Sequence, residues 1–252
     1  MDHVRSFDGT PIAVAVQGDG PAVLLLHGFA ADHRANWAAP GVIAALAAAG
    51  RRVIATDARG HGASGKPHDP LAYEDGAMVR DAKAVLDSLS VESVDVVGYS
   101  MGAMVAARFA ADEPRTRSLV LGGVGGDASP PRRGGAESRL AEALLADDPA
   151  AIRQPAAKGF RVFADRMRAD REALAAIERS NALRSPVRFE AIEVPTLVLV
   201  GDADSLIRPP EELVARLPNA RLERIPGDHL TAVGHPRFAR AIVRFLEENS
   251  PP

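Results

Sequence analysis

Short apolar segments alternate with longer amphipathic segments along most of the chain. The apolar runs predict strands, and the helical periodicity between them predicts helices. The expected strands cover 22–26, 52–56, 94–99, 118–124, 196–200 and 221–225, and the expected helices cover 41–49, 73–89, 103–110, 211–216 and 236–247. A further segment, Val4–Val16, predicts a hairpin that turns at Asp8-Gly9. Eight strands that mostly alternate with helices favour an α/β fold with a mostly parallel sheet covered by helices on both faces.

The alternation stops between residues 125 and 193. A glycine- and proline-rich loop, 125–131, begins this segment, and a polar, arginine-rich stretch without a clear strand follows. Helices are expected over 136–145, 155–164 and 168–181. We interpret 125–193 as a small helical cap inserted into an α/β core of 1–124 and 194–252. Such a cap would cover the carboxyl edge of the sheet, where open α/β sheets place their ligand sites.

Composition excludes several classes of function. The chain has 252 residues, 46% of them hydrophobic, which suits one large α/β domain or a core with an insertion. Its formal net charge of -3 gives no footprint for nucleic acid or an acidic membrane surface. Cysteine is absent, which excludes disulfides, thiolate metal sites and a cysteine nucleophile. The first residues lack the apolar core of a signal peptide and no segment is long enough to span a membrane, so we expect a cytoplasmic protein. The sequence specifies no oligomeric state.

The most informative motif is Gly98-Tyr99-Ser100-Met101-Gly102, which lies between a predicted strand and a predicted helix. Strand, sharp turn and helix form the context in which Gly-x-Ser-x-Gly makes a nucleophile elbow. Side chains at the two glycine positions would crowd this turn, and the serine would be held in a strained backbone conformation with its oxygen exposed. An ordinary small-residue turn needs the glycines but not the serine, so the motif favours catalysis.

A serine alcohol needs a base to become a nucleophile, and the base needs a third group to orient it. Candidates follow the last two predicted strands, which run into Gly201-Asp202-Ala203-Asp204 and into Pro226-Gly227-Asp228-His229. Loops at one edge of a parallel sheet are neighbours in space, so Ser100, a carboxylate and His229 can converge. The chain order Ser, Asp, His is the order of the α/β-hydrolase arrangement.

With these residues located, the chain resembles the α/β-hydrolase superfamily over nearly its whole length. Besides the elbow and the two strand ends, two further segments match in the expected order. One is His27-Gly28-Phe29 after the third strand, and the other is Asp57-Ala58-Arg59-Gly60-His61-Gly62-Ala63-Ser64 after the fourth. Five matching segments are far more specific than a single pentapeptide.

The resemblance implies a role for each matching residue. Ser100 would attack a substrate carbonyl, and His229 would take its proton and later deliver it to the leaving group. The pattern Gly-x-x-Asp implies that Asp204 orients His229, while Asp202 serves the turn. Asp127 is a third candidate for the acid, because some relatives place it after the sixth strand.

The same resemblance implies an oxyanion hole formed by the backbone N–H groups of Phe29 and Met101. The side chains of these two residues are expected to line the substrate pocket. Trp37, the only tryptophan, is expected to pack against the first helix, with a place at the border of the pocket as the alternative.

The remaining polar side chains have structural interpretations. His27 and His61 lie in glycine-rich turns and are expected to buttress the oxyanion loop through hydrogen bonds, whereas His33 is expected at the surface. One arginine of the cap could clamp a substrate carboxylate, but interleaved acidic residues favour solvated helix faces. No ligand spacing indicates a metal, and no cofactor is expected.

These features predict a cofactor-independent serine hydrolase that cleaves a carboxylic ester or lactone through an acyl-enzyme on Ser100. Phe160, Phe163 and Phe189 could form a modest apolar lid, which suits a small to medium substrate. A serine at the elbow argues against epoxide hydrolysis and dehalogenation, which this family ties to a carboxylate nucleophile. The alternatives are hydrolysis of a C–C bond beside a carbonyl, a perhydrolase or haloperoxidase-like activity, and a non-catalytic small-ligand receptor on the same fold.

Overall fold

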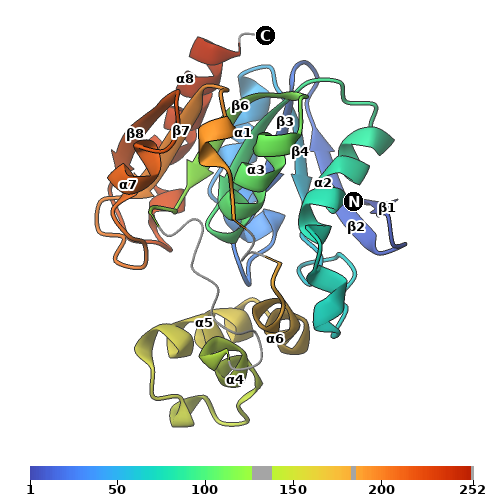
Figure 1. Cartoon of the computed structure of the whole chain (residues 1–252), viewed down its shortest axis with the longest axis vertical. Coiled ribbons are helices and arrows are strands. Elements are labelled where there is room, and N and C mark those ends of the chain that lie inside the picture. The colour runs from blue at the N-terminus through green and yellow to red at the C-terminus, as the bar shows by residue number, and fades with distance from the viewer. Residues whose placement is uncertain (127–137, 183–185, 251–252) are drawn as a thin grey trace.

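An eight-stranded sheet forms the centre of the molecule (Figure 1). The computed structural model describes residues 1–126, 138–182 and 186–250. The strands are β1 (Asp2–Arg5), β2 (Pro11–Gln17), β3 (Ala22–Leu26), β4 (Arg52–Thr56), β5 (Val94–Tyr99), β6 (Thr116–Gly122), β7 (Thr196–Gly201) and β8 (Ala220–Ile225). Their order is β1-β2-β4-β3-β5-β6-β7-β8, with β2 antiparallel to β1 and β4 and the remaining pairs parallel. The predicted α/β fold with a mostly parallel eight-stranded sheet is confirmed.

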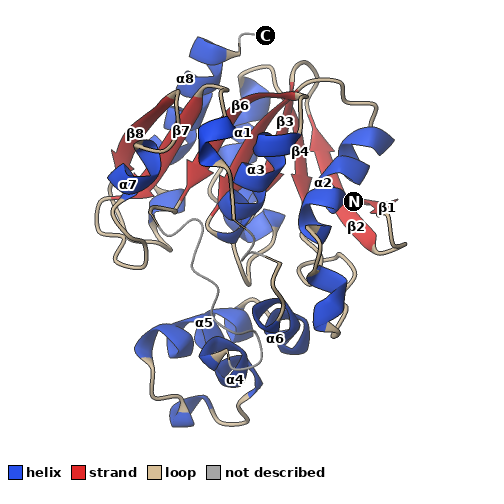
Figure 2. Ribbon diagram, viewed as in Figure 1, coloured by secondary structure: helices blue, strands red, loops and turns tan. Residues whose placement is uncertain are grey.

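Helices cover both faces of this sheet (Figure 2). Successive strand residues point to opposite faces, so Leu24 and Leu25 of β3 belong to two different hydrophobic clusters. The cluster around Leu25 is covered by α1 (Val42–Ala48) and α8 (Pro236–Asn249). The cluster around Leu24 is covered by α2 (Ala77–Ser88), α3 (Met101–Asp112) and α7 (Pro210–Val214). Apolar runs buried on both faces explain why these strands lack a polar face in the sequence.

Three helices between β6 and β7 form a separate layer beyond the carboxyl edge of the sheet (Figure 1). They are α4 (Arg139–Leu145), α5 (Pro155–Arg166) and α6 (Arg171–Arg179). Short helical turns occupy Arg34–Ala38, Pro70–Tyr73, Pro149–Ala151, Phe189–Ala191 and Ala232–Gly234. The three helices lie within residues 125–193, the segment predicted to form a cap, and the boundaries of that cap stay a prediction.

One helix boundary differs clearly from its prediction. The expected helix 73–89 begins only at Ala77, because the chain before it makes a turn of its own. The carboxylate of Asp69 caps that turn by accepting the N–H of Leu71 at 3.0 Å. Asp75 and Gly76 then adopt φ values of 52° and 66°, which interrupt the right-handed helix. Across the described ranges, no helix combines the length and apolar character that a membrane crossing requires.

Candidate active site

Ser100 lies in the turn between β5 and α3 in a strained backbone conformation. Its φ of 52° and ψ of -114° fall in a region that costs a non-glycine residue about 1–3 kcal/mol. The turn is held by hydrogen bonds: the N–H of Ser100 donates to the carbonyl oxygen of Gly122 at 2.8 Å, and its own carbonyl accepts from Ala103 and Met104. This geometry places Ser100 at the carboxyl edge of the sheet, beside the first amides of α3.

Gly98 and Gly102 make the turn possible. A Cβ atom on Gly98 would lie 2.3 Å from the carbonyl oxygen of Gly102, and one on Gly102 would lie 2.0 Å from that of Leu26. Both obstacles are backbone atoms, which cannot move aside as the end of a flexible side chain can. The close approach of α3 to β3 and β5 therefore requires glycine at both positions.

Three side chains from separate loops form a hydrogen-bonded line. Oγ of Ser100 lies 2.9 Å from Nε2 of His229, and Nδ1 of His229 lies 2.7 Å from Oδ2 of Asp204. The Asp204 side chain is fully buried, and its Oδ1 also accepts the N–H of Leu206 at 3.0 Å. Because the carboxylate accepts at Nδ1, we assign the ring proton to that nitrogen, which leaves the lone pair of Nε2 facing the hydroxyl. This arrangement can take a proton from Ser100.

The other carboxylates expected near His229 have different places. Asp202 accepts the N–H of Gly227 at 3.0 Å with Oδ1, which ties the loop after β7 to the loop after β8. Asp127 lies outside the described residues. The backbone of His229 is held separately, since the Tyr99 hydroxyl donates to its carbonyl oxygen at 2.6 Å. Asp204 is thus the candidate acid that reaches the imidazole.

The backbone N–H groups of Phe29 and Met101 flank the elbow. Within the described part of the chain, neither N–H has a hydrogen-bond acceptor. The preceding N–H, that of Gly28, donates to Oδ1 of Asn36 at 2.8 Å and fixes the peptide that leads to Phe29. Sequence reasoning missed Asn36, which is buried in the helical turn Arg34–Ala38 and belongs to no motif in the sequence.

Two buried histidines support the loop that carries Phe29. Nε2 of His61 accepts the N–H of Ala30 at 3.1 Å, and Nε2 of His27 accepts the N–H of Ala58 at 2.9 Å. Burial lowers the pKa of His61 to about 3, and burial also lowers the pKa of His27. Both rings are therefore neutral and can accept these hydrogen bonds, as expected for residues that buttress the loop.

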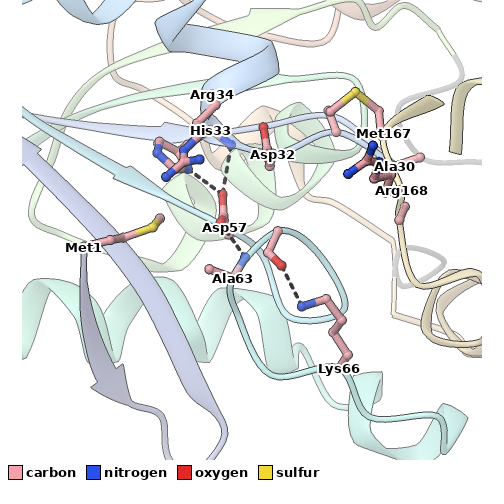
Figure 3. A pocket seen from close by; sticks show the side chains of 13 residues that line it. Met1, Ala30, Asp32, His33, Arg34, Asp57, Ala63, Lys66, Met167 and Arg168 are labelled. Carbon is pink, nitrogen blue, oxygen red and sulfur yellow. Dashed lines mark hydrogen bonds and ion pairs between the residues drawn. The ribbon is translucent and has the colours of Figure 1, made fainter. Parts of the chain in front are cut away.

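His33 is buried rather than at the surface, which corrects the sequence-based expectation (Figure 3). Its Nδ1 and its backbone N–H lie 2.8 Å and 2.9 Å from Oδ1 of Asp57. Burial alone would raise the pKa of Asp57, but hydrogen bonds from His33 and Ala63 hold it well below its usual range. The ionised carboxylate that follows β4 is thus stabilised by donors from two loops, His33 after β3 and Ala63 after β4.

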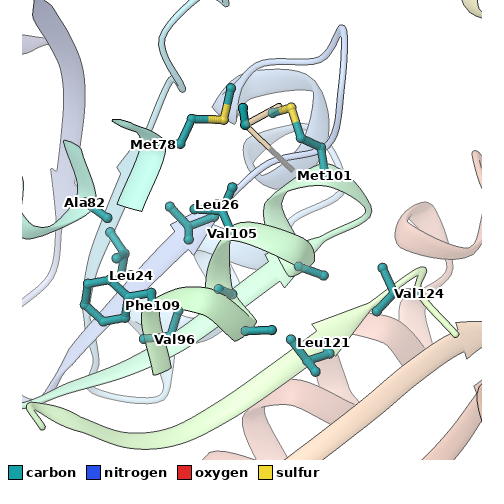
Figure 4. Close-up of a cluster of buried hydrophobic side chains, with 14 of the residues drawn as sticks. Leu24, Leu26, Met78, Ala82, Val96, Met101, Val105, Phe109, Leu121 and Val124 are labelled. Carbon is teal, nitrogen blue, oxygen red and sulfur yellow. The ribbon is translucent and has the colours of Figure 1, made fainter. Parts of the chain in front are cut away.

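Of Phe29 and Met101, whose side chains are both expected to line the pocket, the structure places only Phe29 at the cavity beside Ser100. Met101 begins α3 with its side chain turned into the core beside Leu26 and Val105 (Figure 4). Trp37 is fully buried in the cluster on the opposite face of the sheet. Helix and loop geometry therefore leave Met101 with only its backbone N–H at the elbow, and Trp37 with a packing role.

Two cavities meet at Ser100 and His229. The smaller, of about 120 Å³, is lined by Gly28, Phe29, Ala31, Ala35, Asn36, Tyr99, Ser100, Phe160, Phe163, His229, Leu230 and Val233. The larger, of about 310 Å³, is lined by Ser100, Met104, Gly123, Val124, Ala156, Phe160, Leu206, Ile207 and His229. Phe160 of α5 borders both, and its ring lies edge-on to Phe29 with centroids 6.0 Å apart. Phe160 therefore forms a wall shared by the two cavities.

Neither cavity at Ser100 has an Asp, Glu, Lys or Arg among the described residues that line it. No described cap arginine lines these cavities, although Arg161 is buried rather than solvated and pairs with Asp165 at 2.9 Å. Within residues 1–126, 138–182 and 186–250, no cluster of three His, Cys, Asp or Glu side chains could hold a metal ion. The lining is suited to a neutral, largely apolar ligand.

Comparison with known proteins identifies relatives of this arrangement. A protein-family model described as the alpha/beta hydrolase fold matches residues 21–167 of this chain. The chain is 37% identical over 122 residues to epoxide hydrolase 3 of Siraitia grosvenorii, a match that covers 48% of this chain and 38% of that protein. It is 44% identical over 103 residues to epoxide hydrolase B of Mycobacterium tuberculosis, covering 41% of this chain and 28% of that protein. The matches span well under half the length of these curated relatives.

Among solved structures, the similarity extends over nearly the whole chain. A thermophilic esterase from Thermogutta terrifontis has a TM-score of 0.75 at 27% identity, covering 98% of this chain and 97% of that chain. The family model spans more than half of the residues, and the sheet agrees with it; the chain therefore belongs to the α/β-hydrolase family.

Proposed function

We propose that the protein is a cofactor-independent serine hydrolase that cleaves carboxylic esters or lactones through an acyl-enzyme on Ser100. One observation carries the proposal: Oγ of Ser100, the imidazole of His229 and the buried carboxylate of Asp204 are joined by hydrogen bonds of 2.9 Å and 2.7 Å. A nucleophile, a base and an orienting acid in hydrogen-bond reach are what acyl transfer from a neutral ester needs.

Each group has a defined task in the proposed reaction. As Oγ of Ser100 bonds to the carbonyl carbon, Nε2 of His229 takes the hydroxyl proton, and Asp204 stabilises the resulting cation. The carbonyl oxygen becomes an oxyanion, which the N–H groups of Phe29 and Met101 would bind. Such donors typically contribute about 3 kcal/mol each to the barrier.

The remaining steps complete the formation of the acyl-enzyme and then hydrolyse it. The bond between the carbonyl carbon and the alcohol oxygen breaks, and His229 gives its proton to the leaving oxygen, which leaves an acyl group on Ser100. Water then attacks this acyl ester while His229 takes its proton. Collapse of the second intermediate releases the carboxylic acid and returns the proton to Oγ.

The serine favours esters over the epoxides that the curated relatives are named for. If Oγ of Ser100 opened an epoxide, the product would be an alkyl ether, which has no carbonyl for water to attack. An ester substrate instead leaves an acyl group that water can remove. The similar whole-chain fold of the Thermogutta terrifontis esterase agrees with this choice.

The cavities suggest the size and charge of the substrate. Volumes of about 120 Å³ and 310 Å³ on the two sides of Phe160 suit a small to medium ester with two apolar parts of unequal size. Hydrolysis of a C–C bond and perhydrolysis would use the same three side chains. No described residue in either cavity favours one of them over ester hydrolysis.

Hydrolysis of p-nitrophenyl acetate and butyrate tests the proposal, with Ser100→Ala as the matched variant. We expect Ser100→Ala to lower kcat/KM by about 10³-fold or more, and a fluorophosphonate to label wild-type Ser100 but not the variant. A wild-type protein that hydrolyses neither esters nor lactones and resists the fluorophosphonate would contradict the proposal and support a ligand receptor instead.

A further inference from the structure

A third cavity, of about 290 Å³, lies beside the smaller of the two at Ser100, and Figure 3 shows the side chains that line it. Its walls come from two layers of the molecule, because Arg34 and Lys66 belong to core loops and Arg168 belongs to the turn between α5 and α6. Ala31 lines both this cavity and the smaller one at Ser100, so the two are neighbours. The third cavity is therefore a place where the core and the cap share a polar surface.

Cationic side chains border this cavity from both layers. Among the described residues, the guanidinium groups of Arg34 and Arg168 have neither a hydrogen-bond partner nor an ion pair. Nζ of Lys66 donates to the carbonyl oxygens of Gly62 and Ser64 at 2.6 Å and 3.0 Å. An ammonium has three N–H groups, so one remains for a ligand.

The two carboxylates at this cavity are already engaged by protein donors. Oδ1 of Asp57 accepts from the backbone and the ring of His33, and its Oδ2 accepts the N–H of Ala63 at 2.8 Å. Oδ1 of Asp32 accepts the N–H of Ala35 at 2.8 Å. The acids thus offset part of the positive charge, while the unpaired donors belong to the cationic groups.

Buried His33 adds a polar atom to the same wall. Its Nδ1 faces Asp57, and within the described residues its second ring nitrogen, Nε2, has no hydrogen-bond partner. With the ring proton on Nδ1 beside Asp57, Nε2 carries a lone pair and is an acceptor rather than a donor. His33 therefore engages Asp57, and the donors available to a ligand are the cationic groups of Arg34, Arg168 and Lys66.

The backbone of Arg168 is an independent observation. Its φ of 52° lies in the left-handed region, at a helix end where glycine is the usual residue. An arginine in this conformation is strained, and strained residues concentrate at ligand clamps and other functional sites. The turn nevertheless carries a long cationic side chain that borders the cavity.

We propose that this cavity binds a small molecule through an oxyanion, a carboxylate or phosphate group, held between Arg34 of the core and Arg168 of the cap. Guanidinium groups match the geometry of both oxyanions through paired hydrogen bonds. The volume of about 290 Å³ exceeds that of a bare ion and accommodates a small metabolite. Binding would join the cap to the loop that carries Phe29, and it does not depend on the ester hydrolysis proposed above.

Calorimetric titration of the full chain tests this site, with inorganic phosphate and succinate as separate probes at constant ionic strength. We expect saturable binding of one of them, and the probe that binds identifies the oxyanion. Arg34→Gln and Arg168→Asn should each raise Kd about tenfold or more, as expected for the loss of a charged hydrogen bond. Asparagine tolerates the left-handed conformation, so Arg168→Asn keeps the turn.

Arg166→Gln is the matched control, because Arg166 is an exposed arginine of α5 that does not border the cavity. It should change Kd by less than about twofold, since general charge effects on an exposed surface are small. The proposal is overturned if neither probe binds, if both cavity variants bind as the wild type does, or if Arg166→Gln weakens binding equally. Circular dichroism of each variant confirms that the fold is intact.

Discussion

The carboxyl edge of the sheet and the cap contribute different things to the candidate active site. At the sheet edge, hydrogen bonds of 2.9 Å and 2.7 Å connect Ser100, His229 and Asp204, each in the loop or turn that follows a strand. The described cap residues that line the two cavities are Ala156, Phe160 and Phe163, which offer apolar surface and no polar side chain. Chemistry that depends on sub-ångström placement thus rests on rigid elements, while the cap shapes the space above it.

The two regions also differ in how tightly they are packed. A Cβ on Gly102 at the elbow would meet a backbone oxygen at 2.0 Å, whereas a Cβ on Gly159 of α5 would meet nothing within 4 Å. The elbow therefore does not accommodate an added side-chain atom at Gly102, whereas α5 of the cap accommodates one at Gly159. The following four predictions test this contrast.

The largest effect is expected at the orienting acid. Asp204→Asn should lower kcat with p-nitrophenyl butyrate about 10⁴-fold, because an amide no longer holds His229 in the productive tautomer. Asp202→Asn is the matched control: its side-chain oxygen can still accept the N–H of Gly227, so kcat should change less than about threefold. Equal effects of the two variants would remove Asp204 from the proposed mechanism.

The next largest effect concerns the elbow glycine. Gly102→Ala should lower the free energy of unfolding by about 3 kcal/mol or more, because its Cβ overlaps the carbonyl of Leu26. Gly159→Ala in the cap should instead raise it by up to about 1 kcal/mol, as alanine favours an open helical position. Urea denaturation measures both. Similar stability of the two variants would show that the elbow is looser than described.

A pH effect should follow from the buried histidines at the sheet edge. Burial lowers the pKa of His61 to about 3 and lowers that of His27, while unfolded imidazoles bind a proton near pH 6.5. As the pH falls, the unfolded state therefore binds protons at these imidazoles and the native state does not. The free energy of unfolding falls with the pH. Between about pH 7.5 and pH 5, His61 alone should account for about 2 kcal/mol of lost unfolding free energy.

Urea titrations at these two pH values check the pH effect. His61→Gln should lose about 2 kcal/mol less than the wild type does over this range, although it is less stable at pH 7.5. An unchanged pH dependence in the variant would mean that His61 is not kept neutral by its surroundings.

The smallest effect is expected in the cap and concerns selectivity. Phe160→Ala removes the wall shared by the two cavities, so kcat/KM for p-nitrophenyl octanoate relative to acetate should rise about tenfold. Phe163→Ala widens only the smaller cavity and should shift the ratio less than about threefold. An unchanged ratio in Phe160→Ala, with activity intact, would contradict the role of Phe160 but not the proposed ester hydrolysis.

The sequence by itself determined the sheet, most helices and the place of the elbow. These follow from local information: strand and helix periodicity, and glycines spaced around Ser100 in a strand-turn-helix context. The helix expected to begin at residue 73 begins at Ala77 instead. The left-handed conformations of Asp75 and Gly76 belong to a turn that the apolar pattern does not predict.

Only the tertiary structure decided which groups meet. It brought the expected Asp204 within 2.7 Å of His229, aimed the Met101 side chain into the core instead of the pocket and buried His33 against Asp57. It also joined Asn36 to Gly28. Hydrogen-bond partners and cavity walls depend on how distant segments pack, and packing is a property of the whole fold that no local pattern encodes.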